Sequence, residues 1–186
     1  GMANVVIVNG SPNAASRLTG ILNHAEKLLA ESGIEVEAIH VAVLPANDLV
    51  FGRYDKQEIK AAIARVERAD AVLFASPVYK ASYTGLLKLF IDLLPRDVLA
   101  DKWVAPVFIG GTIAHLLSVD FAFKPVAAAI GARRFAPVVY AVDAQVTRTE
   151  QNGELHFELD AELKERLEAA IGQLARERGA GAAEPC

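Results

Sequence analysis

The amino-acid sequence predicts an α/β protein in which helices cover both faces of a parallel sheet of five strands. Two observations predict this class. Short apolar segments alternate along the chain with segments whose apolar residues recur every three or four positions, which is the pattern of strands alternating with helices. In addition, residues 71–75 are almost wholly apolar, as expected of a strand buried on both faces. The strand order 2-1-3-4-5, which makes the sheet doubly wound, fits this alternation.

The length and composition predict one domain. A chain of 186 residues suffices for one well-buried core and is short for two. The chain is 53% hydrophobic but only 7% aromatic, which suits strands covered on both sides by helices. We therefore expect a single domain over residues 1–178, followed by a disordered Gly/Ala-rich tail at 179–186.

Charge, hydropathy and cysteine content exclude several classes of protein. The net charge is −4 with both signs mixed along the chain, and the absence of a basic block argues against nucleic-acid binding. No apolar stretch approaches the roughly 18 uninterrupted residues of a membrane span. The single cysteine, Cys186, excludes a disulfide framework and a cysteine-based metal site. With no secretion signal in the N-terminal sequence, we expect a cytoplasmic protein.

The first strand and helix enclose the most informative loop of the sequence. Residues 5–8 are an unbroken apolar run that ends at Asn9-Gly10-Ser11-Pro12. A helix is expected to begin near Ser16, which is a good N-cap residue. Its apolar residues share one face of a 3.6-residue period. They are Leu18, Ile21, Leu22, Ala25, Leu28 and Leu29.

This strand–loop–helix arrangement predicts an anion site. Backbone N–H groups at the helix start favour negative charge, and Arg17 with the hydroxyls of Ser11, Ser16 and Thr19 can complete the hydrogen bonds of a phosphate. The loop lacks both the G-x-x-x-x-G-K-[ST] and the G-x-G-x-x-G patterns, which argues against a nucleoside triphosphate or the usual dinucleotide site. A terminal monophosphate remains. Taken alone, the loop is equally consistent with an ordinary first turn of an α/β protein.

The next elements lead to a second loop of interest. Residues 34–43 predict a strand near the sheet edge, and residues 44–54 predict a connection that covers the ligand site or reaches a neighbouring subunit. A helix is expected from Asp55, where Glu58 completes a capping-box pattern. The third strand follows at residues 71–75.

Residues 76–85 follow the third strand and end at the same edge of the sheet as the first loop. Tyr79 and Tyr83 offer flat rings to an aromatic ligand, although they equally suit packing of the loop against the next helix. That helix is expected from Thr84 to Pro95. Its strongly apolar face indicates either the core or an oligomer interface.

The fourth strand, at residues 104–109, ends in a glycine pair. Pro106 within it predicts that one side of this strand is not fully paired. At Gly110-Gly111-Thr112 the missing side chains allow a ligand ring to approach backbone amides. His115 lies in the first turn of the following helix, near the same edge.

The remaining elements are a helix over residues 114–124 with a break at Pro125, a fifth strand at 135–142, a polar loop at 143–158 and a last helix from Asp160. No motif of metal-ligand spacing occurs among them. We therefore predict no metal site.

Three segments together resemble the NADPH-dependent FMN reductase family, most closely the reductases of two-component alkanesulfonate monooxygenase systems. They are G-S-P-x-x-x-S-R at 10–17, S-P-V-Y-K-A-S-Y-T-G at 76–85 and G-G-T-I-A-H-L-L-S-V-D-F-A-F-K-P at 110–125. The resemblance covers residues 4–146. It implies a flavodoxin-like fold, assembly as a homodimer or homotetramer, and hydride transfer from a reduced nicotinamide to FMN.

The resemblance also implies site residues. Ser11, Ser16 and Arg17 would hold the FMN phosphate; Pro77, Val78, Tyr79 and Lys80 would line the isoalloxazine; Gly111, Thr112 and His115 would contact its far side. No catalytic side chain is predicted, because the hydride passes between the two cofactors.

The chain departs from the family pattern at two positions. Leu18 stands where the family often has Ser, Thr or Asn, so that phosphate contact is lost or passes to Thr19. Phe121 stands where the compared sulfonate reductases have Tyr, an aromatic residue implied to lie at the subunit interface near the flavin. Losing the hydroxyl bears on whether FMN leaves as a product or stays bound.

The sequence therefore predicts an NAD(P)H-dependent FMN reductase that supplies reduced FMN to a separate flavin-dependent monooxygenase. Alternatives are a reductase that retains FMN and acts on quinones, azo dyes or metal oxyanions, a flavodoxin-like electron carrier, and a non-catalytic nucleotide-binding module. The choice of NADPH or NADH stays open, because Arg17, Arg53 and Arg96 are each candidates to reach a 2′-phosphate. The partner enzyme stays open as well.

Overall fold

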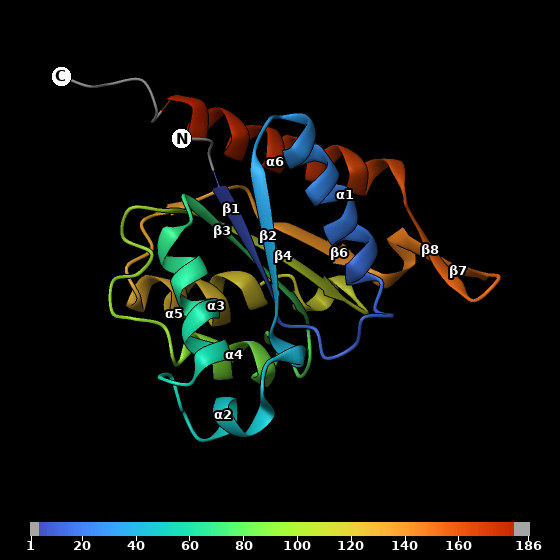
Figure 1. Cartoon of the computed structure of the whole chain (residues 1–186). Coiled ribbons are helices and arrows are strands. Elements are labelled where there is room, and N and C mark those ends of the chain that lie inside the picture. The colour runs from blue at the N-terminus through green and yellow to red at the C-terminus, as the bar shows by residue number, and fades with distance from the viewer. Residues whose placement is uncertain (1–3, 181–186) are drawn as a thin grey trace.

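A central parallel sheet of six strands forms the core of the computed structural model, which describes residues 4–180 (Figure 1). The strands follow the order β2-β1-β3-β4-β5, and β6 pairs with β4 beyond the end of β5. This confirms the predicted order 2-1-3-4-5, with the predicted fifth strand divided in two. The strands are β1 Asn4–Asn9, β2 Glu35–His40, β3 Ala71–Pro77, β4 Trp103–Gly110, β5 Arg134–Phe135 and β6 Val139–Val142.

Helices cover both faces of this sheet, as predicted (Figure 1). Helices α1 (Leu18–Glu31) and α6 (Ala161–Ala180) pack on one face. Helices α3 (Gln57–Arg68), α4 (Gly85–Ile91) and α5 (Lys124–Ala129) pack on the other. The central strands β1, β3 and β4 have no exposed residue, because each face of the sheet is buried against a separate apolar cluster.

Several predicted boundaries are corrected by the structure. The second strand ends at His40 and gives way to a 3₁₀ turn, η1 (Val41–Val43), and the connection that follows contains a short helix, α2 (Ala46–Val50). Helix α3 begins at Gln57 without the capping box predicted at Asp55. Helix α4 ends at Ile91, before the predicted Pro95.

Pro106 lies where the pairing of β4 is interrupted on one side, as predicted. On one side of β4, β5 pairs with residues 103–104 and β6 with residues 107–110, so the pairing is interrupted at residues 105–106. Proline has no N–H to donate, and the gap in the ladder falls where a donor is missing. On its other side, β4 pairs with β3 without interruption.

The prediction of one continuous helix over residues 114–124 is wrong. The segment contains a 3₁₀ turn, η2 (Ile113–His115), and a π-helical turn, η3 (Val119–Phe123), before α5 begins at Lys124. Pro125 lies in the first turn of α5, where proline is tolerated because the early N–H groups have no helical partner, so it does not break the helix. A π-turn holds one extra residue, which changes the direction of the side chains that precede it.

The polar loop predicted at residues 143–158 is also wrong. After a 3₁₀ turn, η4 (Asp143–Gln145), the chain forms an antiparallel hairpin of β7 (Val146–Gln151) and β8 (Glu154–Leu159) that projects from the body of the molecule (Figure 1). The turn residues Asn152 and Gly153 have φ values of 53° and 79°. Two consecutive left-handed residues form the two-residue turn that Asn-Gly favours.

The end of the chain follows the prediction in part. Asp160 caps α6, since its Oδ1 accepts the N–H of Leu163 at 2.8 Å. Helix α6 continues to Ala180, and the rest of the tail predicted at 179–186 lies outside the described residues. Within residues 4–180, no helix combines the length and the apolar character needed to cross a membrane.

Candidate functional site

The loops after β1, β3 and β4 meet at a pocket of about 240 Å³ at the C-terminal edge of the sheet. In doubly wound sheets this edge is the usual place for a ligand. Segments far apart in the sequence contribute to the pocket. Its lining residues are Asn13, Ser16, Arg17, Pro77, Val78, Tyr79, Ile109, Gly110, Gly111, Asp143 and Arg148.

The loop at residues 10–17 is ordered by its own side chains. Asn9 Oδ1 accepts the N–H of Ser11 at 2.9 Å, and Asn13 Oδ1 accepts the N–H of Ala15 at 2.9 Å. Ser11 is only 6% exposed, and its hydroxyl donates to the Asn13 carbonyl at 3.0 Å while accepting the Asn13 N–H at 3.2 Å. The Ser11 hydroxyl therefore shapes the loop from within.

This loop leaves several donors without an acceptor. In the described part of the chain, the backbone N–H groups of Ala14 and Arg17 donate to nothing. Arg17 donates through Nε to the Val146 carbonyl at 2.9 Å, and neither of its terminal nitrogens has an acceptor within residues 4–180. The Ser16 hydroxyl accepts the Leu18 N–H and keeps its own proton to donate. Such a set of donors at a helix start suits a phosphate.

Thr84 connects the loop after β1 to the loop after β3. Its hydroxyl donates to the Gly10 carbonyl at 2.6 Å and accepts the N–H of Leu87 at 3.1 Å, so it caps α4. Its own N–H donates to Ser76 Oγ at 2.9 Å, and Ser76 in turn donates to the Pro77 carbonyl. All of these bonds are buried, so the two loops are held in one fixed relation.

A tight turn presents Tyr79 at the mouth of the pocket. Tyr79 and Ser82 exchange backbone hydrogen bonds of 2.9 and 3.2 Å, and the intervening Lys80 and Ala81 have φ values of 52° and 64°. Two successive non-glycine residues in the left-handed region carry strain of the kind that concentrates at ligand sites. The Tyr79 side chain is left 52% exposed, with its ring accessible for stacking.

The third loop is fixed by Tyr140. The Tyr140 hydroxyl donates to the Thr112 carbonyl at 2.7 Å. Burial, and secondarily the nearby Asp143 carboxylate, raise the pKa of Tyr140, so the hydroxyl stays protonated and able to donate. A side chain at Gly110 would collide with this hydroxyl, which explains why glycine is needed there. At Gly111 the backbone itself borders the pocket.

Half of the predicted site residues line this pocket: Ser16, Arg17, Pro77, Val78, Tyr79 and Gly111. Thr19 instead supports the loop, donating to the Ala14 carbonyl at 2.8 Å, and the Leu18 side chain is fully buried in the core. Lys80 and Thr112 lie in the two loops beside the pocket. His115 and Phe121 line a neighbouring cavity of about 280 Å³ together with Ala81. For these residues, contact with a ligand stays a prediction.

Sequence reasoning missed several lining residues, above all Asp143 and Arg148. Both belong to the segment that was interpreted as a polar loop. The signal that identifies the hairpin was present, because Asn152-Gly153 stands between segments of alternating character. Among the described residues, no group of three or more His, Cys, Asp or Glu side chains is arranged to hold a metal ion.

Two features lie together at the C-terminal edge of this doubly wound sheet. One is the loop before α1, whose free donors suit an anion, and the other is the exposed Tyr79 ring beside the backbone of Gly110-Gly111. Together they define a flavodoxin-like nucleotide-binding protein. The donors without acceptors fit a terminal monophosphate. The exposed backbone at Gly110-Gly111, here called the glycine edge, fits a flat ring. The model of the NADPH-dependent FMN reductase family matches residues 3–147, and the chain belongs to this family.

Individual relatives agree with this assignment. The chain is 39% identical over 167 residues to an FMN reductase (NADPH) of Pseudomonas putida, covering 90% of this chain and 84% of that one. It is 40% identical over 144 residues to an FMN reductase (NADPH) of Escherichia coli, covering 76% and 74%. Among solved structures, the apo form of the NADH:FMN oxidoreductase EMOB superposes with a TM-score of 0.83 at 30% identity, covering 95% and 90%. The chain is thus an oxidoreductase whose cofactors are FMN and a reduced nicotinamide.

Proposed function

We propose that this chain is an NAD(P)H-dependent FMN reductase that uses FMN as a substrate and supplies reduced FMN to a flavin-dependent, alkanesulfonate-type monooxygenase. The observation that carries the proposal is the meeting of the phosphate-accepting loop and the glycine edge in one shallow pocket. Tyr79, half exposed, leaves the ring end open, which favours exchange of the flavin. Since the nicotinamide cofactors are held inside cells, the proposal includes a cytoplasmic location.

In this proposal, the residues of the chain bind FMN and orient it. The N–H groups of Ala14 and Arg17, the Ser16 hydroxyl and the Arg17 guanidinium hold the phosphate. Tyr79 and the Gly110-Gly111 backbone would lie beside the isoalloxazine, where backbone N–H groups would donate to its polar edge. FMN held by these residues would supply the acceptor for the hydride of the nicotinamide. Lys80, Thr112 and His115 lie at the rim of the same site in this proposal.

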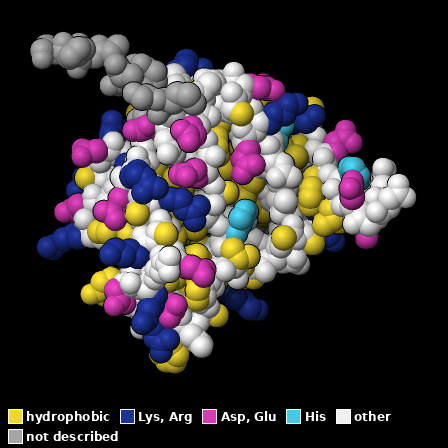
Figure 2. All heavy atoms as spheres, in the orientation of Figure 1, with side chains coloured by type: hydrophobic (Ala, Val, Ile, Leu, Met, Phe, Trp, Pro, Cys, Tyr) yellow, Lys and Arg dark blue, Asp and Glu magenta, His cyan; other side chains and the backbone are white. Residues whose placement is uncertain are grey.

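The proposal includes assembly as a homodimer or homotetramer. Large apolar side chains are exposed along residues 113–121, where Phe121 is 76% exposed. Further large apolar side chains are exposed on and beside α2, among charged ones at the lower end of Figure 2: Val43, Val50, Phe51 and Tyr54. Exposed patches of this kind usually mark an interface. In the assembly, Phe121 lies between subunits near the flavin.

The test is NADPH oxidation by flavin-stripped protein under nitrogen, with free FMN titrated from zero to many equivalents. We expect the rate to saturate only at FMN concentrations well above that of the enzyme, and reduced FMN to pass a protein-retaining filter. A parallel titration with NADH determines which nicotinamide is preferred.

Other outcomes would reject the proposal. If one equivalent of FMN stays bound and turnover requires an added quinone or azo dye, the chain is an FMN-retaining reductase, and Phe121→Tyr is the first variant to examine for restored flavin release. Flavin binding with a stable semiquinone but without NADPH oxidation would indicate an electron carrier. Binding with neither activity would indicate a nucleotide-binding module.

A further inference from the structure

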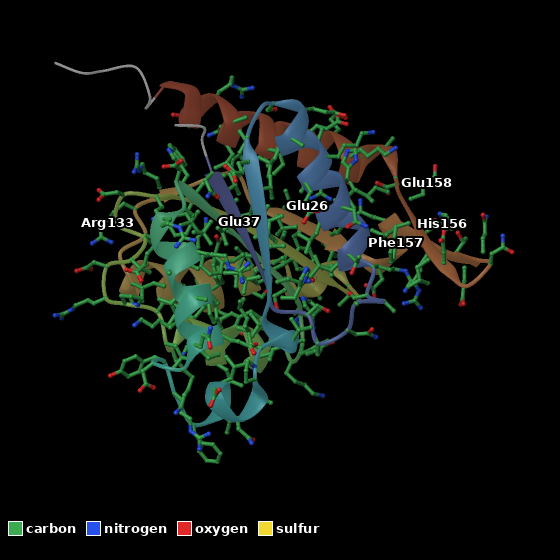
Figure 3. All side chains as sticks on the ribbon, in the orientation of Figure 1. Glu26, Glu37, Arg133, His156, Phe157 and Glu158 are labelled. Atoms are coloured by element: carbon green, nitrogen blue, oxygen red, sulfur yellow. The ribbon has the colours of Figure 1, made fainter. Side chains whose placement is uncertain are left out.

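The β7–β8 hairpin is anchored on helix α1 beside the phosphate-accepting loop. Val146 and Leu159, a directly opposed pair at its base, are both buried in the core. Phe157 packs so closely over Gly20 that any side chain at position 20 would collide with it. Figure 3 shows Phe157 at the base of the hairpin, next to α1. The hairpin is therefore held in a defined position relative to the loop.

The register of the hairpin places Arg148 on this same face. Arg148 lies directly opposite Phe157, and opposed residues of an antiparallel pair project to the same side. Arg148 Nη1 donates to the Ala15 carbonyl at 2.6 Å, which aligns the guanidinium over the loop. Its Nε and Nη2 have no acceptor in the described part of the chain, and Arg148 lines the same pocket as Arg17.

Each of the two arginines donates a hydrogen bond across the contact between the loop and the hairpin. Arg17, from the loop, donates to the Val146 carbonyl of the hairpin, and Arg148, from the hairpin, donates to the Ala15 carbonyl of the loop. Asp143, the acidic residue of the pocket, lies beside Gly111, where a Cβ would be 3.8 Å from its Oδ2. Within residues 4–180 it forms no ion pair with either arginine. Both guanidinium groups thus keep terminal N–H groups free for an anion.

We propose that Arg148 is a second phosphate-binding residue, which with Arg17 forms a two-arginine clamp that makes the site select the phosphorylated flavin FMN over riboflavin. The inference rests on the proposed function, because it takes FMN to be the ligand of the pocket. A phosphate monoester carries close to two negative charges near neutral pH, and the two guanidinium groups that line this pocket match that charge. The hairpin is then part of the binding site.

The test measures dissociation constants of oxidised FMN and of riboflavin for the full, flavin-stripped chain by quenching of flavin fluorescence. Arg148→Gln is expected to weaken FMN binding about 10- to 100-fold, as loss of charge-assisted hydrogen bonds does, and to change riboflavin binding less than about twofold. The salt dependence of FMN binding should fall as well. Arg148→Lys, which keeps the charge but not the planar fork, is expected to recover part of the FMN affinity.

Arg133→Gln is the matched control. Like Arg148, Arg133 donates Nη1 to a backbone carbonyl, here that of Ala132 at 3.1 Å, but it lies on the opposite side of the molecule from the hairpin (Figure 3). It should leave both constants unchanged. Equal weakening of FMN and riboflavin by Arg148→Gln would mean that Arg148 only supports the loop, and an increase in KM for NADPH alone would assign it to the nicotinamide; either result overturns the inference. Failure of the unsubstituted chain to bind FMN would instead reject the proposed function itself.

Discussion

Phe123→Ala is expected to lower the free energy of unfolding by about 3–5 kcal/mol, the usual range for removing a buried aromatic ring. Phe123 is fully buried at the end of the π-helical turn. Its ring centroid lies 5.3 Å from that of Phe74, 5.5 Å from that of Phe108 and 6.2 Å from that of Tyr83. The cavity left by alanine would open between β3, β4 and the π-helical turn. Chemical denaturation followed by circular dichroism measures the loss.

Phe121→Ala is the control from the same turn, since Phe121 is largely exposed although it lies only two residues away. We expect it to change stability by less than about 0.5 kcal/mol at high dilution, as surface substitutions do. If subunits associate through Phe121, its effect should grow with protein concentration, whereas that of Phe123→Ala should persist at every concentration. Equal losses from the two substitutions under dilute conditions would contradict the π-turn geometry.

These two phenylalanines also explain why the helix over residues 114–124 was predicted wrongly. A period of 3.6 residues cannot distinguish an α-helix from a segment that begins as a 3₁₀ turn and ends as a π-turn, because both bring apolar residues to one side every few positions. Phe123 packs inward against Phe74 and Phe108, which belong to β3 and β4 and lie outside the segment itself. That tertiary contact is invisible to a local pattern.

The strands and the three loops were predictable for the opposite reason. Residues 5–8 and 71–75 are so uniformly apolar that a fully covered strand is the natural interpretation. The first strand ends at Asn9, directly after its apolar run, whereas the third continues through Pro77. Gly110 likewise indicates its role locally, because it lacks a side chain. The contribution of Arg148 was not predictable from such signals, because it depends on the docking of the hairpin on Gly20.

Thr84→Val is expected to lower the free energy of unfolding by about 1–3 kcal/mol and to weaken FMN binding at the same time. Valine has nearly the same shape as threonine but leaves the buried Gly10 carbonyl without its donor at 2.6 Å and the Leu87 N–H without its cap. The loop after β1 would then no longer be tied to the loop after β3. Since Thr84 itself does not line the pocket, any loss of flavin affinity must act through the position of these loops.

Three variants, Thr84→Val, Thr84→Ser and Thr19→Val, separate the possible roles of Thr84 when each is measured by denaturation and by flavin titration. Thr84→Ser keeps both hydrogen bonds and should retain most of the FMN affinity. Thr19→Val removes a hydroxyl that bonds to the Ala14 carbonyl at an exposed position, and it should cost less stability because water can replace that bond. If Thr84→Val proved no more harmful than Thr19→Val, the buried bond to Gly10 would not be what holds the phosphate loop in register with the ring-binding loop. The affinity of the site would then depend on the hairpin side of the loop alone, where Arg17 and Arg148 bridge it to β7.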